Sequence, residues 1–189
     1  HRNALEKALH AESRHGKTNP NNSELIAIQT WFDLSPKPYQ QEMLDRLAAE
    51  RLHQRYRNLL VAATGTGKTV VAAFDYARLA KEKGGQPRLL FVAHRVQILI
   101  QAISTFRQVL RDSNFGDLLD GNNEASQHEH LFVTINTAHN RNLVGRHGAD
   151  FWNMVIIDEA HHLPASSFDK FITSVRPAIL LGLTATPER

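Results

Sequence analysis

The sequence predicts an α/β fold in which helices cover both faces of a mostly parallel central sheet. Five apolar segments are short and nearly continuous, which is typical of strands buried on both faces. Segments with helical periodicity separate several of them, and such alternation of strands and helices favours parallel pairing. The chain of 189 residues is 42% hydrophobic and 22% charged, which suits one globular domain with a sizeable core.

The N-terminal part is expected to lead into this domain. Glycine, proline and asparagine cluster at 15–23 and predict a turn or linker, so residues 1–22 are expected to be the tail of an upstream region. The domain itself is expected to span 23–189. Leu25 and neighbouring apolar residues fall at helical spacing and predict a short helix, which Pro36 would end.

The remaining elements follow in order along the chain. An apolar stripe among charged residues predicts an amphipathic helix over 39–55. The expected strands are 58–63, 88–93, 131–135, 154–158 and 178–184, and the other expected helices are 69–83, 95–110 and 165–174. The polar, turn-rich segment 111–130 is expected to be a loop with room for one short edge strand.

Composition excludes some classes of protein without selecting a function. No apolar run approaches the roughly 20 residues that span a bilayer, and the first residues lack the apolar core of a signal peptide. The chain has no cysteine, which excludes disulfides and fits a reducing cytoplasm. We therefore expect a cytoplasmic protein without a membrane partner. The net charge of +3 permits nucleic-acid binding but does not require it.

The segment AATGTGKT, residues 62–69, has the spacing of a phosphate-binding loop, with Ala62 where glycine is usual. Its glycines would let successive backbone N–H groups point at phosphate oxygens, and the following helix would add its positive dipole end. Lys68 would reach the β- and γ-phosphates, and the Thr69 hydroxyl would bind Mg²⁺. The residues expected to bind nucleotide here are Ala63, Thr64, Gly65, Thr66, Gly67, Lys68 and Thr69. An accidental turn is disfavoured because an expected strand precedes the segment and a helix follows it.

A second group of acidic residues follows another buried strand. Asp158 comes directly after four apolar residues, so it would emerge at the carboxyl end of the sheet, where ligands of open α/β folds bind. We expect Asp158 to bind Mg²⁺ and Glu159 to orient and deprotonate an attacking water. With Lys68, these two carboxylates form the expected catalytic group. The other possibility, that they only end a strand, is disfavoured by the presence of the phosphate loop.

These segments resemble, in order along the chain, motifs I, II and III of superfamily 2 helicases and translocases: AATGTGKT, DEAH and LTATPER. The segments KPYQQEML, FVAHRVQIL and FVTINTAH resemble the upstream glutamine motif, motif Ia and the motif Ib region. The resemblance covers about 36–189 and implies the first RecA-like domain of an ATP-dependent motor.

The resemblance implies further roles for individual residues. It places Gln40 near the adenine of ATP. Thr184, Thr186 and His161 would link the nucleotide site to the nucleic-acid track. His94, Arg95, Thr134 and Thr137 would contact the sugar–phosphate backbone, and such contacts fix register without reading sequence.

Within the superfamily, the chain looks closest to bacterial type III restriction-like helicases that carry an N-terminal phospholipase-D-like nuclease domain. This resemblance implies a fused nuclease and a second RecA-like domain, which is absent from this chain. We expect the domain alone to bind nucleotide but hydrolyse it weakly, because arginine fingers contribute roughly 10³–10⁵ in rate. The form VAHR of motif Ia favours DNA over RNA. Two alternatives stay open: a nucleotide-dependent switch or assembly module acting on a protein partner, and a duplex translocase subunit of a restriction-type nuclease.

Overall fold

The computed structural model describes residues 34–121, 123–159 and 165–185. The linker expected at 1–22 and the helix expected around Leu25 lie outside these residues. The helices are α2 (Pro38–Leu52), α3 (Lys68–Lys83), α4 (Val96–Leu110), α5 (Ile135–Asn140), α6 (Leu143–His147) and α7 (Ala165–Ser174). The strands are β1 (Arg57–Val61), β2 (Leu89–Ala93), β3 (Asp117–Leu119), β4 (His130–Thr134), β5 (Met154–Asp158) and β6 (Ile179–Thr184).

The six strands form one sheet in the order β1-β6-β5-β2-β4-β3, and the neighbours in this order pair in parallel. This arrangement confirms the predicted α/β class. The short edge strand expected within 111–130 is β3, at the end of the sheet. Helices α5 and α6 were not predicted, because six and five residues are too few to show a helical period.

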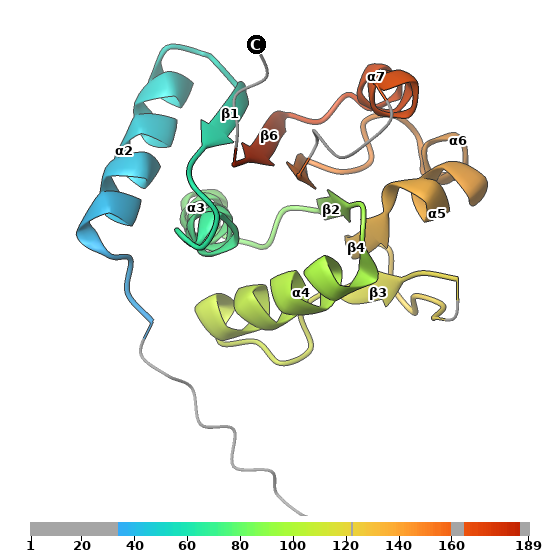
Figure 1. Cartoon of the computed structure of the whole chain (residues 1–189), viewed down its shortest axis with the longest axis horizontal. Helices are drawn as coiled ribbons and strands as arrows, with labels where there is room; N and C mark the ends of the chain where they lie inside the picture. Colours follow the sequence, from blue (N-terminus) through green and yellow to red (C-terminus); the bar gives the residue numbers. More distant parts are fainter. Residues whose placement is uncertain (1–33, 122, 160–164, 186–189) are drawn as a thin grey trace, which may run out of the picture. The chain divides into compact units, whose positions relative to one another are not determined.

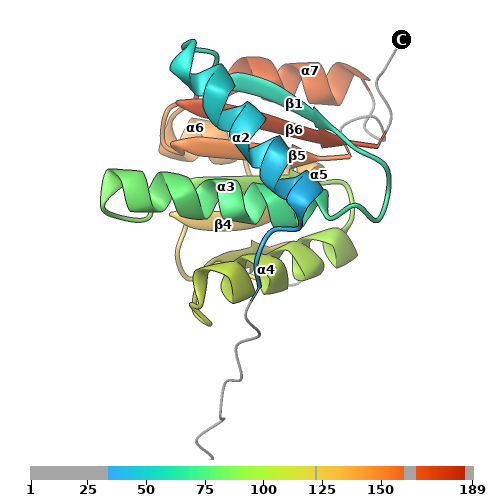
Figure 2. The ribbon, with the colours of Figure 1, turned by 90° about the vertical axis from the view of Figure 1, so that its left-hand side faces the viewer.

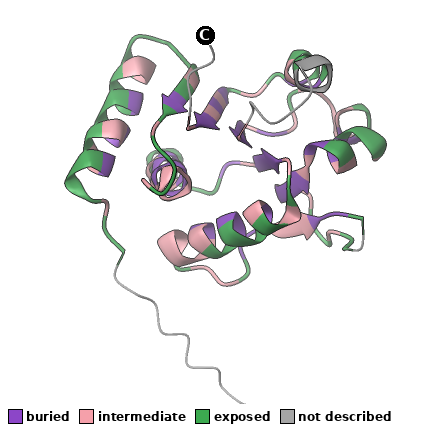
Figure 3. Cartoon of the chain, viewed as in Figure 1, coloured by how far each residue is buried: buried purple, intermediate pink, exposed green. Residues whose placement is uncertain are grey.

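Helices cover both faces of the sheet (Figure 1). Helices α2, α3 and α4 pack on one face and α5, α6 and α7 on the other, as the turned view also shows (Figure 2). Strand β2 explains why a continuous apolar run is needed: Leu89, Phe91 and Ala93 enter the first core, whereas Leu90 and Val92 enter the second. The buried residues accordingly concentrate between the layers (Figure 3).

The parallel order brings all the strand-ending loops to one edge of the sheet. The phosphate loop follows β1, the segment at His94 follows β2, and Glu159 follows β5. Ligand sites in open α/β sheets lie at this carboxyl edge. Within the part of the chain that the structure describes, no helix combines the length and the apolar character needed to cross a membrane.

Candidate nucleotide-binding site

The phosphate loop joins β1 to α3 in a left-handed turn. Gly65 and Gly67 have φ angles of 81° and 78°, a region that costs side-chain-bearing residues energy, so glycine is required for the turn. Lys68 lies in the first turn of α3, and its Nζ donates to the carbonyl oxygens of Ala62 at 3.0 Å and Ala63 at 3.3 Å. Its ammonium group therefore lies over the loop that was predicted to bind phosphate.

Two side chains from the first turn of α2 donate hydrogen bonds to the phosphate loop. Gln40 is buried, its Oε1 accepts from the Lys37 backbone N–H at 3.0 Å, and its Nε2 donates to the Thr66 carbonyl at 3.0 Å. The Tyr39 hydroxyl donates to the same carbonyl at 3.1 Å. Tyr39 was not predicted, although its place beside Gln40 in the glutamine motif was a signal. The contact of Gln40 with adenine stays a prediction.

Asp158 ends β5 and lies against the start of α3. It is 5% exposed and accepts a hydrogen bond from the Thr69 side chain. Burial, followed by the neighbouring Glu159 carboxylate, raises the pKa of Asp158 to about 6, while Lys68 and the Thr69 hydrogen bond lower it. The structure thus brings together the two predicted Mg²⁺ ligands.

Glu159 adopts a strained backbone conformation directly after β5. Its φ is 52°, in the left-handed region that residues other than glycine seldom occupy, and its N–H donates to the Leu183 carbonyl of β6 at 3.0 Å. Its carboxylate Oε2 lies 3.4 Å from Nδ1 of His94. Strands β2 and β5 explain this contact, since Val92 pairs with Ile157 and each of the two side chains lies two residues further on.

Thr184, one of the predicted coupling residues, ends β6 beside the phosphate loop. It is buried, it pairs with Val61 of β1, and its carbonyl oxygen accepts from the Ala62 N–H at 3.1 Å. Strand β6, which ends in the segment that resembles motif III, is therefore hydrogen-bonded to the first residue of the phosphate loop. The other two predicted coupling residues, His161 and Thr186, lie outside the described residues.

The four residues predicted to contact nucleic acid differ in accessibility. Arg95 is exposed at the start of α4, whereas His94 is only 16% exposed. Thr134 caps α5: its Oγ1 accepts from the Thr137 N–H at 3.2 Å and donates to the Thr137 hydroxyl at 2.8 Å. These two hydroxyls therefore have a structural role in starting a helix.

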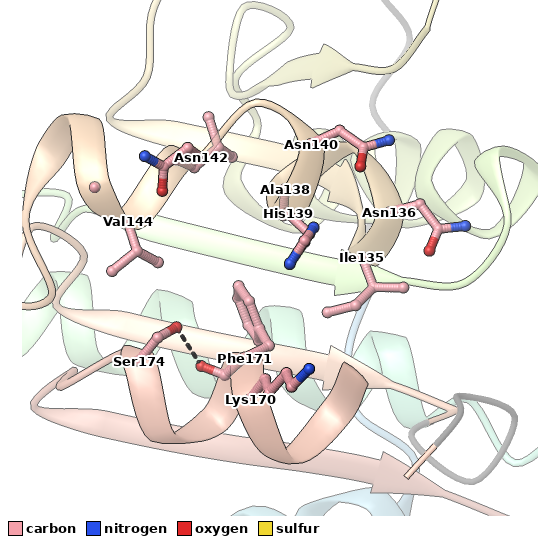
Figure 4. A pocket seen from close by; sticks show the side chains of 12 residues that line it. Ile135, Asn136, Ala138, His139, Asn140, Asn142, Val144, Lys170, Phe171 and Ser174 are labelled. Atoms are coloured by element: carbon pink, nitrogen blue, oxygen red, sulfur yellow. Dashed lines mark hydrogen bonds between the residues drawn. The ribbon is translucent and has the colours of Figure 1, made fainter. Parts of the chain in front are cut away.

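A cavity of about 810 Å³ opens beside that capped helix, between α5 and α6 on one side and α7 on the other (Figure 4). The exposed side chains of Asn136, His139 and Asn140 line it from α5, and Lys170 and Phe171 face them from α7. This cavity was not predicted, because the helix α5 that lines it was not predicted.

Comparison with known proteins yields a consistent set of relatives. The chain is 30% identical over 174 residues to the type I restriction enzyme EcoAI endonuclease subunit of Escherichia coli, covering 86% of this chain and 21% of that protein. It is also 30% identical over 174 residues to a Halobacterium salinarum protein provisionally named DNA 3'-5' helicase Rad25, covering 89% of this chain and 26% of that one. The chain thus spans about a quarter of the length of these curated relatives.

A solved structure supports the fold. A nuclease-deletion mutant of the type ISP restriction-modification enzyme LlaGI, in complex with a DNA substrate mimic, matches with a TM-score of 0.64 at 21% identity, over 82% of this chain and 18% of that one. Finally, residues 33–189 match a family described as type III restriction enzyme, res subunit. This match spans the phosphate loop, the DEAH segment and the whole described sheet, and so the chain belongs to the ResIII family of restriction-enzyme and superfamily 2 helicase motor domains.

Proposed function

We propose that this chain is the first RecA-like motor domain of an ATP-dependent helicase or translocase that acts on DNA. One observation carries the proposal: the strand order β1-β6-β5 puts the phosphate loop and the Asp158–Glu159 pair at one edge, with Thr69 bonded to Asp158. A loop for phosphate, a hydroxyl, and two carboxylates are the parts that phosphoryl transfer to water requires.

The proposed reaction is hydrolysis of ATP to ADP and phosphate. A water oxygen bonds to the γ-phosphorus while the bond from that phosphorus to the β–γ bridging oxygen breaks in line with it, and the electron pair leaves with ADP. Glu159 accepts the proton that the water loses. Lys68 stabilises the negative charge on the phosphate oxygens, and the glycine-containing loop supplies backbone N–H donors.

The residues at the edge of the sheet also fit Mg²⁺. A hydroxyl and a carboxylate oxygen are the ligands that this cation prefers, and Thr69 and Asp158 are already in contact. When bound, Mg²⁺ neutralises charge on the β- and γ-phosphates. The proposal assigns it to these two side chains.

The names of the relatives support DNA as the nucleic acid on which the protein moves. They include a restriction endonuclease subunit and a protein provisionally named DNA 3'-5' helicase, and the matched LlaGI structure is a complex with a DNA substrate mimic. On this chain, the exposed Arg95 guanidinium at the carboxyl edge is suited to a phosphate backbone.

The whole protein is proposed to extend beyond this domain. A second RecA-like domain would close over the ATP and contribute an arginine finger, and a nuclease domain would be fused upstream through residues 1–22. Opening and closing of the two motor domains would step the protein along the backbone. The proposed compartment is the cytoplasm.

The test is steady-state ATP hydrolysis by the intact protein, alone and with duplex DNA, single-stranded DNA or RNA. Strong stimulation by DNA, abolished in Glu159→Gln, is the expected result. Hydrolysis that is abolished by Glu159→Gln but indifferent to every nucleic acid would instead favour a switch module acting on a protein partner. Translocation on duplex DNA without strand separation would identify a duplex translocase serving a nuclease.

A further inference from the structure

His94 lies in the turn between β2 and α4, one residue after a fully buried strand. Its side chain is 16% exposed, and that of Glu159 is 32% exposed. The two face each other across the carboxyl ends of neighbouring strands, with Nδ1 of His94 3.4 Å from Oε2 of Glu159. A side chain this buried presents little surface to a nucleic-acid backbone, so its position suits a role inside the protein.

The next residue has the opposite character. Arg95 is exposed, adopts an extended conformation and immediately precedes α4. One short turn therefore carries an exposed cation and, adjoining it, a half-buried imidazole that faces the proposed catalytic carboxylate. An anion that shifts the backbone of Arg95 also shifts His94, because the two residues share a peptide bond.

We infer that His94 is a positioning residue for Glu159, and that a nucleic-acid backbone bound at Arg95 promotes hydrolysis through this contact. The inference rests on the proposed function, because it takes Glu159 as the group that accepts the proton from water. It assigns His94 to the control of hydrolysis, whereas the sequence motif suggested a direct contact with nucleic acid.

The distance explains how the contact can respond to a ligand. At 3.4 Å it is slightly longer than the 2.7–3.2 Å of a normal hydrogen bond, so a shift of a few tenths of an ångström would make it a charge-assisted one. The Glu159 backbone is held separately, by its N–H bond to Leu183 of β6. Movement of the β2–α4 turn can therefore reorient the carboxylate while the backbone stays in place.

The experiment compares three substitutions of His94 in the intact protein. His94→Ala removes the contact. His94→Asn keeps an N–H donor close to the place of Nδ1, whereas His94→Gln puts its amide further out, near the place of Nε2. His53→Ala is the matched control, since His53 is an exposed histidine at the end of α2. For each variant, kcat and KM for ATP are measured with and without duplex DNA, and affinity for a fluorescent ATP analogue reports on folding.

The expected result separates chemistry from binding. His94→Ala and His94→Gln should lower the DNA-stimulated kcat by about 10- to 100-fold, the range typical of removing a hydrogen-bonding partner from a ligand of a metal site. KM for ATP and analogue affinity should stay within about twofold of the parent, because only orientation of the catalytic group changes. His94→Asn should restore most of the stimulation, and His53→Ala should behave as the parent.

The inference is overturned if His94→Ala keeps the parental stimulation while Glu159→Gln abolishes hydrolysis. It is also overturned if Asn and Gln restore activity equally, or if all three variants lose affinity for the analogue, since either result shows that the Nδ1 contact is not what matters. If Glu159→Gln itself retains hydrolysis, the failure belongs to the proposed catalytic assignment.

Discussion

The two glycines of the phosphate loop offer a matched test of how its backbone is maintained. Both have positive φ, 81° at Gly65 and 78° at Gly67. Their surroundings differ: a methyl group on Gly65 would meet no atom within 4 Å, whereas one on Gly67 would lie 2.6 Å from Nε2 of Gln40. Gly65→Ala therefore probes backbone strain alone, and Gly67→Ala adds a steric clash with a buried amide.

The magnitudes follow from these two terms. Left-handed backbone costs a residue with a Cβ about 1–2 kcal/mol, which is the expected loss of unfolding free energy for Gly65→Ala. In Gly67→Ala the Gln40 amide must also give up its hydrogen bond to Thr66. Leaving such a buried polar group unsatisfied costs about 1–3 kcal/mol, so the total expected is about 2–5 kcal/mol.

Urea unfolding of the single variants, of Gln40→Ala and of Gly67→Ala combined with Gln40→Ala measures both terms. Removing the Gln40 side chain removes the clash. The cost of Gly67→Ala in that background should therefore fall to about 1–2 kcal/mol, the value for Gly65→Ala. The reasoning is refuted if Gly65→Ala and Gly67→Ala cost the same, or if the Gln40→Ala background leaves the cost of Gly67→Ala unchanged.

Three further predictions concern stability. Arg51 pairs with the Asp75 carboxylate, which is 2% exposed, in a bidentate contact. Arg51→Ala should lower the free energy of unfolding, measured in urea, by about 3–5 kcal/mol, because it leaves this buried carboxylate without its partner. A loss below about 1 kcal/mol would contradict this. Burial lowers the pKa of His130 below its usual 6.5, so the folded protein favours the neutral imidazole. The contribution of His130 to the free energy of unfolding should therefore be fully present above pH 6.5 and be lost as the pH falls through the pKa of the folded state. The urea midpoint of His130→Gln should depend less on acidification than that of the parent. Thr134→Ala should lower the free energy of unfolding by about 1 kcal/mol, because it removes the hydroxyl that caps α5. Thr134→Ser should retain the cap, because its hydroxyl oxygen can also accept from the Thr137 N–H.

The sequence predicted the central strands well because they are apolar on both faces, whereas in the edge strand β1 only Leu60 is buried and the expectation of burial on both faces was wrong. In β2 and β5 every residue is buried, so the apolar segment of the sequence is nearly continuous and its ends predict the ends of the strand to within a residue or two. The same logic failed for α5 and α6. They are held by local features, the Thr134 cap in one case and the positive φ of Asn142 before the other, and neither leaves a periodic pattern.

The candidate site shows a second limit of sequence reasoning. The motifs predicted Thr69 and Asp158 as ligands of Mg²⁺, and in the structure the two side chains are hydrogen-bonded to each other. The partner of Glu159 was beyond prediction, because it depends on β5 lying beside β2, from which it is separated along the chain by β3 and β4. Motif Ia instead suggested a surface role for His94. Chain order tells which residues end strands, but only strand order tells which ends are neighbours.

Strand order also explains why one residue can respond to two ligands. Glu159 follows the strand that lies between β6 and β2, so its N–H is held by Leu183 on one side while its carboxylate faces His94 on the other. The β6 side ends at Thr184, which is bonded to the start of the phosphate loop, and the β2 side continues into the exposed Arg95. A nucleotide bound at the loop and an anion bound at Arg95 would thus act on Glu159 through different contacts. Such separate connections allow the two ligands to be coupled without touching each other, provided that each changes the preferred orientation of the same carboxylate.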